Sequence, residues 1–450
     1  MIFRRYGQFT GGIDLPDEKD ATLESPIVPW RRIERLCVPL GRGASASAHL
    51  LVRPAQRVSA GEKIAASDAG GADVFAPLAG TVASLTKASV VTGEGLASVP
   101  AVELTDLSAP SPIMPLSPTF DWRSVSPQTL RGQIGGGGLT GPGSSPLPLE
   151  VWVRKAFGRK CRTLVLNAME NQPYVTADHR LLVEHGAEVI RGLAMLGTAL
   201  QIRSVLLAAD IRRIDDYREI IGPARMYGIE RIALPHKYPI GLPPMLTKVL
   251  TRREMPPGGS VMDVGVVIVD VSTCFALYRW VVCGQPQTHR VATVAGERAP
   301  QCGNFWIPFG LACRTLVAGA QEPIICGGPM DAVRCGSAVA TAATNAVLAL
   351  DAPLPAPPGP CIRCGWCTDH CPARLNVAAL NDAFELGLLQ RARRLGARAC
   401  VECGVCSYVC PARLPLTARV KQLKRTVGRV PTNRAALASM PKDQTGRGES

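Results

Sequence analysis

Residues 361–367 read Cys-Ile-Arg-Cys-Gly-Trp-Cys and are followed by Cys371-Pro372. The pattern recurs at residues 400–406, Cys-Val-Glu-Cys-Gly-Val-Cys, followed by Cys410-Pro411. Each copy is a C-x2-C-x2-C-x3-C-P run, the spacing with which bacterial proteins bind two [4Fe–4S] clusters. The duplicated run therefore predicts that the C-terminal part of the chain is built around two iron–sulfur clusters.

The assignment of ligands follows from how such paired runs bind. The fourth cysteine of each run ligates the cluster of the other run, which ties the runs together and keeps the clusters close enough for electron transfer. Gly365 and Gly404 give each loop the freedom to curl around its cluster. We predict that one cluster is held by Cys361, Cys364, Cys367 and Cys410, and the other by Cys400, Cys403, Cys406 and Cys371.

Two other uses of these cysteines fit less well. Zinc sites of four thiolates usually come from two separated cysteine pairs, without the third closely spaced cysteine. A disulfide framework is disfavoured in a long chain with no segment that resembles a signal peptide. The remaining eight cysteines have no metal-ligand spacing, and we interpret them as small buried hydrophobic residues. They are Cys37, Cys161, Cys274, Cys283, Cys302, Cys313, Cys326 and Cys335.

Length and charge narrow the class of protein. The chain has 450 residues, of which 46% are hydrophobic, and a formal net charge of +14. This length predicts about three domains. The basic tail at 426–450 fits either a solvated end or a surface for an acidic partner or anionic lipid. Nucleic acid is excluded as a partner, since only 5% of residues are aromatic and no nucleic-acid motif is present.

The most apolar stretch does not predict a membrane span. It is Val261–Cys283, which Asp263, Asp270 and Arg279 interrupt. Its valine content favours strands. Nothing at the N-terminus resembles a targeting peptide. We therefore expect no transmembrane segment and, because free thiols accompany the clusters, a reducing compartment, the cytoplasm.

The first third of the chain has β character. Short apolar runs alternate with glycine and proline between residues 33 and 105. Two pieces, 57–64 and 76–82, resemble the halves of a biotinyl/lipoyl-like barrel-sandwich hybrid. A working carrier would hold a lysine between the halves, and residues 66–73 contain none. We assign residues 1–107 to a barrel-sandwich hybrid domain with a structural role.

The middle of the chain changes to an alternation of strands and helices. A glycine-rich loop at 135–141 precedes this pattern, which begins at Thr163. Asp178 is expected to cap a helix that reaches about Gly197. Such alternation predicts a parallel sheet of the nucleotide-binding type. We assign residues 119–255 to a Rossmann-like α/β domain of the flavin-binding kind.

The last part is divided by proline- and glycine-rich breaks. Renewed β character predicts a β-grasp (SLBB-like) module at 256–318, followed by a connecting segment at 319–352. The two cysteine runs lie in an α-helical, ferredoxin-like dicluster domain at 353–425, and the basic tail follows. The expected fold class is thus multidomain, α/β with β modules.

Taken in order, these segments resemble the C subunit of the Rnf-type ion-translocating electron transport complex. The related cobalamin reductases resemble parts of the chain but carry the hybrid after the clusters. The resemblance rests on residues 9–13 (FTGGI), 164–168 (LVLNA), 173–178 (PYVTAD), 237–239 (KYP), 303–306 (GNFW), 327–329 (GGP) and the two cysteine runs.

The resemblance implies a peripheral protein on the cytoplasmic face of the cell inner membrane. Such a protein would accept hydride from NADH on noncovalent FMN and pass electrons through two [4Fe–4S] clusters to membrane subunits. The FMN-type site would be formed by Gly135, Gly136, Gly138, Asn167 and Glu170.

The flavin segments depart from the family pattern at charged positions. Ser144 stands where the family has a lysine, Gln172 where it has a second acid, and Asp270 where it has an asparagine beside the flavin. An acid there places negative charge near a phosphate. All cluster cysteines are present, so the sequence supports electron transfer more strongly than NADH oxidation.

Three functions stay open at this point. The first is an electron-transfer subunit of an Rnf-like membrane complex, which receives electrons from NADH or a reduced protein. The second is a soluble carrier of the cobalamin-reductase kind. The third is an assembly subunit in which the clusters only stabilise the fold and no NADH activity remains.

Overall fold

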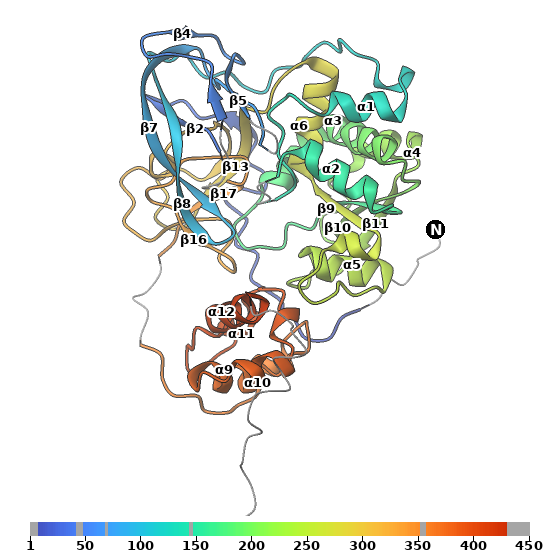
Figure 1. The fold of residues 1–450 in the computed structure, drawn as a ribbon, viewed down its shortest axis with the longest axis vertical. Helices are drawn as coiled ribbons and strands as arrows, with labels where there is room; N and C mark the ends of the chain where they lie inside the picture. The colour runs from blue at the N-terminus through green and yellow to red at the C-terminus, as the bar shows by residue number, and fades with distance from the viewer. Residues whose placement is uncertain (1–7, 42–47, 68–70, 144–146, 352–356, 430–450) are drawn as a thin grey trace, which may run out of the picture.

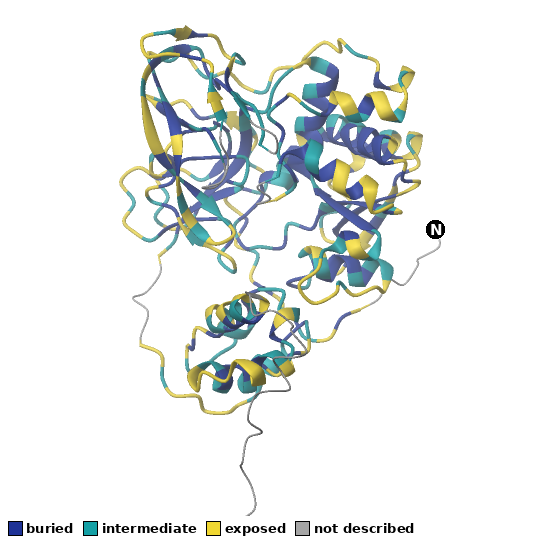
Figure 2. Ribbon diagram, viewed as in Figure 1, coloured by how far each residue is buried: buried dark blue, intermediate teal, exposed yellow. Residues whose placement is uncertain are grey.

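The computed structural model describes residues 8–41, 48–67, 71–143, 147–351 and 357–429. Figure 1 shows three bodies: a β-rich one, an α/β one beside it, and a small helical one below both. The helical body holds the two cysteine runs. A hydrophobic interior is present in each body, as the buried residues in Figure 2 show.

The N-terminal domain consists of two antiparallel sheets. The order of the larger sheet is β2-β8-β7-β4, and that of the smaller is β3-β5-β6. Long strands β7 and β8 pair along their whole length, and alternate residues such as Val102 and Leu104 face the core. The strands are β2 (Leu36–Pro39), β3 (Ala48–Leu50), β4 (Arg57–Val58), β5 (Lys63–Ser67), β6 (Val74–Phe75), β7 (Gly80–Thr92) and β8 (Gly95–Thr105).

The central domain is a parallel sheet with helices on both faces. Its order is β11-β10-β9-β12. Leu164 and Leu166 of β9 pack toward α3 and α6, whereas Val165 between them faces the core that contains α5. The strands are β9 (Thr163–Ala168), β10 (Ser204–Asp210), β11 (Glu230–Leu234) and β12 (Val266–Asp270). The helices are η1 (Trp122–Ser124), α1 (Pro127–Gln133), α2 (Leu149–Gly158), α3 (Ala177–Leu200), η2 (Arg218–Ile220), α4 (Ile221–Met226), α5 (Pro243–Thr251), η3 (Val261–Val264) and α6 (Val271–Cys283).

Two expectations for this region were wrong. Val261–Cys283 contains one strand, β12, and its second half is the helix α6. Valine there reflects burial and not extended structure, because α6 packs on α3 and the sheet. β12 pairs with β9, and so the central domain does not end at residue 255. The sequence pattern missed this because β12 lies far along the chain from the strand it pairs with.

The second β body is a six-stranded mixed sheet of order β1-β14-β13-β17-β15-β16. It joins strands from both sides of the expected boundary at 318, so residues 319–352 are part of this sheet and not only a connection. It shares its core with the N-terminal domain. The elements are β1 (Ile27–Pro29), β13 (His289–Ala295), β14 (Gly303–Pro308), α7 (Cys313–Leu316), β15 (Ile324–Cys326), β16 (Val333–Arg334) and β17 (Ala346–Ala349).

The C-terminal domain is a small helical body. Val377 and Leu380 of α9 pack against Val420 and Leu423 of α12, as their helical spacing predicts. Asn376 caps α9 by accepting the Ala379 N–H at 3.0 Å. The elements are α8 (Trp366–Asp369), α9 (Val377–Glu385), α10 (Leu389–Arg394), η4 (Ala397–Ala399), α11 (Val405–Tyr408) and α12 (Leu416–Arg429).

Candidate cluster and flavin sites

The structure brings the eight predicted ligand cysteines into two groups of four. In each group, three cysteines of one run surround a cavity together with the fourth cysteine of the other run. Cys371 thus lies with the second run, and Cys410 with the first. One cavity is lined by Cys361, Cys364, Cys367 and Cys410, and the other by Cys371, Cys400, Cys403 and Cys406.

Both loops have the same backbone conformation. Gly365 and Gly404 each have φ of 84° and begin the short helices α8 and α11. A glycine is suited to this left-handed region because it has no Cβ. Backbone N–H groups point at sulfur in both runs: Leu375 donates to Cys371 Sγ and Glu402 to Cys400 Sγ, each at 3.4 Å. Such N–H groups stabilise the negative charge of a thiolate-bound cluster.

The two groups differ in exposure. Cys361 and Cys364 are exposed, whereas Cys371 and Cys403 are buried. Burial raises the pKa of the Cys400 thiol to about 12. A metal centre reverses this preference, because it stabilises the thiolate. We call the group around Cys403 the inner group and the one around Cys361 the outer group. Trp366, which lies between Cys364 and Cys367 of the outer group in the chain, is 53% exposed.

The inner group faces the rest of the molecule. Tyr238 donates its hydroxyl hydrogen to the Cys403 carbonyl oxygen at 2.7 Å. The Gly12 N–H donates to the His370 carbonyl oxygen at 2.9 Å. A Cβ on Gly404 would lie 2.4 Å from the Met330 carbonyl oxygen, so glycine is required for this approach. Gly12, Tyr238 and Met330, which are far apart in the sequence, thus all contact the cluster domain here. We call this contact region the joint.

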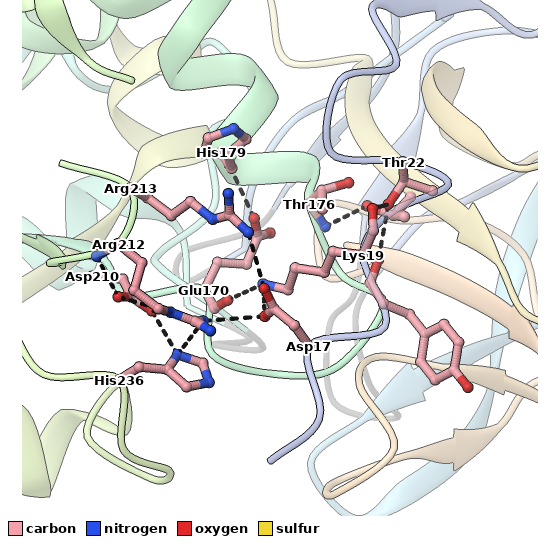
Figure 3. A network of polar contacts seen from close by, with 12 residues as sticks. Asp17, Lys19, Thr22, Glu170, Thr176, His179, Asp210, Arg212, Arg213 and His236 are labelled. Atoms are coloured by element: carbon pink, nitrogen blue, oxygen red, sulfur yellow. Dashed lines mark hydrogen bonds and ion pairs between the residues drawn. The ribbon is translucent and has the colours of Figure 1, made fainter. Parts of the chain in front are cut away.

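A polar network attaches the N-terminal segment, residues 8–29, to the α/β domain (Figure 3). Asp17 lies 3.2 Å from Arg212 and 3.0 Å from Arg213, which follow strand β10. Lys19 is buried and donates to the Glu170 carbonyl oxygen. Because these residues are distant in sequence and form no local motif, sequence reasoning did not find the network.

The same network continues along the carboxyl edge of the sheet. His236 Nδ1 lies 2.6 Å from Asp210 Oδ2, and Arg212 lies 3.1 Å from the same carboxylate. Although burial opposes it, these hydrogen bonds lower the pKa of Asp210 to about 2. Asp210 therefore carries a charge throughout the neutral range.

His179, at the start of α3, gives this region a pH response. Its Nδ1 lies 2.9 Å from the Tyr217 hydroxyl oxygen, and burial lowers the pKa of His179 to about 4. Below about pH 6.5 the unfolded chain binds a proton that the folded chain does not, so lowering the pH from 7 to 5 should cost about 2 kcal/mol of unfolding free energy through this residue.

Denaturant unfolding at both pH values tests this expectation. His179→Gln should reduce the difference in the free energy of unfolding between pH 7 and pH 5. The same substitution at the exposed His49 should leave that difference unchanged. Parallel pH profiles for the native chain and His179→Gln would contradict the assignment.

The glycine loop packs against α6. Trp280 donates its indole N–H to the Gln133 carbonyl oxygen at 2.9 Å and the Gly135 carbonyl oxygen at 3.1 Å. A Cβ on Gly137 would lie within 2.3 Å of that indole, so the loop needs glycine there for packing. Gly135, Gly136 and Gly138 line a cavity of about 550 Å³.

The other two predicted flavin residues are already engaged by the protein. Asn167 donates to the Gly241 carbonyl oxygen at 2.9 Å and accepts from the Met169 N–H at 3.2 Å. The Glu170 carboxylate accepts the N–H groups of Asp178 and His179, both at 3.0 Å. Glu170 therefore caps α3, and the expectation that Asp178 does so was wrong. Glu170 precedes Asp178 by eight residues, and only the fold brings it to the helix end.

One departure from the family pattern, Asp270, adds an acid at the same edge. Asp270 pairs in register with Asn167. Its carboxylate accepts the N–H groups of Thr273 and Gly143, each at 2.7 Å. Burial, together with the charges of Asp270 and Glu170, raises the pKa of Asp178 well above its usual range.

The cavity beside the glycine loop does not fit an anionic phosphate well. Arg154 is ion-paired with Glu150, and Lys63 lies 2.6 Å from Asp73. Among the lining residues that the structure describes, Arg154 is thus the only cation and is already neutralised. Ser144, in place of the family lysine, lies outside the described residues. The loop backbone is suited to a phosphate, and the surrounding charge is not.

Comparison with known proteins agrees with the domain order. Residues 7–105 match the RnfC barrel-sandwich hybrid domain, 134–279 the Nuo51 FMN-binding domain, and 356–411 the 4Fe-4S dicluster domain. The C subunit of an ion-translocating oxidoreductase complex from Salmonella choleraesuis (strain SC-B67) is 31% identical over 381 residues, 82% of this chain. The chain belongs to the RnfC family. The expected barrel-sandwich hybrid, α/β flavin-type domain and dicluster domain are confirmed, as are [4Fe–4S] clusters as cofactors; the match to the FMN-binding domain supports FMN.

A second curated relative of this RnfC-type chain is similar over the same share of the chain. The corresponding protein of Erwinia tasmaniensis, which bears the same description, is 31% identical over 388 residues, again 82% of this chain. The chain spans about half the length of these curated relatives, 53% and 47%. An NAD+-reducing [NiFe]-hydrogenase in the air-oxidised state overlaps with a TM-score of 0.41 at 17% identity, covering 67% of this chain and 54% of the other. That likeness is too distant to indicate function. Among the described residues, no helix is long and apolar enough to cross a membrane.

Proposed function

We propose that this chain is a peripheral electron-transfer component of a membrane-bound Rnf-like oxidoreductase complex, in which each cysteine group binds one [4Fe–4S] cluster. The observation that supports it most is the crossed grouping of eight cysteines. The relatives are subunits of an ion-translocating complex, which supports membrane subunits as partners, and the proposal places the chain on the cytoplasmic face of the inner membrane.

The different surroundings of the two groups support a direction for electron flow. The inner group is buried against Tyr238 and the N-terminal segment, so its electron donor is expected on the side of the α/β domain. The outer group contains the exposed Cys361 and Cys364, and the exposed Trp366 lies between Cys364 and Cys367, so a partner protein can cover this surface. Electrons would then leave the chain from the outer group.

Iron content and reducibility test this proposal. Anaerobically purified protein should contain about eight iron atoms per chain, and dithionite should reduce both clusters. About four iron atoms would contradict the two-cluster assignment. Full iron content with clusters that dithionite does not reduce would contradict electron transfer and favour a structural role.

The flavin site gives a separate prediction. Asp270→Asn removes a negative charge next to the glycine loop and keeps the N-cap of α6, since asparagine caps as well as aspartate. We expect FMN to bind about tenfold more tightly to this variant, equivalent to about 1.4 kcal/mol.

Equilibrium titration with FMN, followed by flavin fluorescence, measures the change. Asp121→Asn is the matched control, because Asp121 is also an N-cap carboxylate but bonds to Arg123, whereas Asp270 accepts the N–H of Gly143, just after the glycine loop. Equal FMN affinity in the native chain and Asp270→Asn would show that this carboxylate does not oppose the phosphate.

A further inference from the structure

Three cysteines outside the two runs converge in the six-stranded sheet body. The Sγ atoms of Cys313, Cys326 and Cys335 all lie within 4.8 Å of one another. The Sγ atoms of Cys313 and Cys326 are 3.8 Å apart. These cysteines have no metal-ligand spacing in the sequence, and only the fold brings them together.

The backbone fixes all three positions. β15 and β16 pair antiparallel with Cys326 opposite Val333, and the Cys335 N–H donates to the Ile324 carbonyl oxygen at 2.8 Å. Cys326 and Cys335 therefore lie on the same face of this hairpin, in diagonal positions. Cys313 is brought to that face by α7, where its N–H donates to the Ala338 carbonyl oxygen at 2.9 Å.

The thiols are closed off from solvent. Cys313 and Cys335 are fully buried, and Cys326 is 5% exposed. Their surroundings are apolar and include Leu316 and Ile324. The three thiols therefore lie beside one another in an apolar core that is closed to solvent.

The 3.8 Å between the sulfur atoms of Cys313 and Cys326 matches thiolates that share one ion. A Zn–S bond of about 2.3 Å in tetrahedral geometry places neighbouring sulfur atoms about 3.8 Å apart. A disulfide requires about 2.05 Å and would leave the third cysteine without a role. Thiolates of an iron–sulfur cluster bind different iron atoms and stand farther apart than thiolates on a single ion.

We propose that Cys313, Cys326 and Cys335 bind one thiophilic cation, Zn²⁺ or Cu⁺, as a third metal site of this chain. Thiolate ligands select these ions. Among the described residues, no fourth His, Cys, Asp or Glu joins the group. The ion would connect α7 to the β15–β16 hairpin. It would thereby stabilise the hairpin from which Met330 contacts the cluster domain.

Metal analysis of the full-length, cluster-loaded protein tests the site. Anaerobically purified protein, with its iron–sulfur cysteines occupied, is expected to contain about one equivalent of zinc or copper besides iron. Cys335→Ala and Cys326→Ala should lose this equivalent and keep their iron. Cys274→Ala is the matched control, because Cys274 is fully buried but belongs to no thiol group.

Two further measurements decide between the outcomes. Protein grown with either added zinc or added copper shows which ion is retained, and X-ray absorption at that metal's edge should show sulfur at about 2.3 Å. Retained iron together with a native circular dichroism spectrum of the apo variants excludes misfolding as the cause of metal loss. The proposal is overturned if the native protein holds neither metal, if Cys335→Ala keeps it, or if mass spectrometry finds a Cys313–Cys326 disulfide.

Discussion

Replacing Cys371 and Cys403 together by alanine is expected to leave one iron–sulfur cluster intact, although the two residues belong to different cysteine runs. Both line the inner cavity, and Cys410 completes the outer group. The double variant should therefore retain about four iron atoms, half of the native content.

The contrasting variant is Cys361→Ala combined with Cys371→Ala. These residues share a run, but they lie in different groups, so both clusters should be damaged and iron should fall close to zero. Iron analysis and electron paramagnetic resonance of the reduced proteins measure the difference. Were each run to bind its own cluster, the two double variants would exchange results.

Gly404→Ala is expected to destabilise the protein far more than Gly365→Ala. Both glycines have φ of 84°, so each substitution carries the same backbone cost of about 1 kcal/mol. Only at Gly404 would the new Cβ also meet backbone, at 2.4 Å from the Met330 carbonyl oxygen, whereas the nearest atom at Gly365 is the Asp369 carboxylate at 3.7 Å. That overlap should add about 1–3 kcal/mol.

Because the overlap lies at the joint, Gly404→Ala should also weaken the contact between the cluster domain and the rest of the molecule. Denaturant unfolding gives the free energies, and limited proteolysis should release the cluster domain faster from Gly404→Ala than from Gly365→Ala. Equal losses for the two variants would show that Met330 moves aside without cost and that the joint is not rigid.

The features that the sequence predicted well are those encoded within a few residues. The cysteine runs, the two halves of the hybrid and the alternation in the central domain are local patterns, and each was found in the structure. The cap of α3 shows the limit: the sequence indicated Asp178, and only the way strand β9 meets the helix brings Glu170 to the helix end instead.

The features that the sequence did not predict depend on pairing between distant segments. β12 belongs to the central sheet because it pairs with β9, a strand about one hundred residues earlier, and no local pattern records that partner. The same holds for Asp17 with Arg212 and Arg213. The three cysteines around Cys326 also come from separate segments, and singly each resembles an ordinary buried residue.

The position of the N-terminal segment has a consequence for biosynthesis. Residues made first find their partners among residues made much later: Gly12 bonds to His370, Ile13 pairs with Tyr238, and β1 pairs with β14. These are contacts of very high sequence separation, which form slowly and late in folding. The three bodies can therefore assemble only after translation has passed the first cysteine run. Until then the N-terminal segment, which connects the bodies, lacks its partners and is accessible to chaperones and proteases.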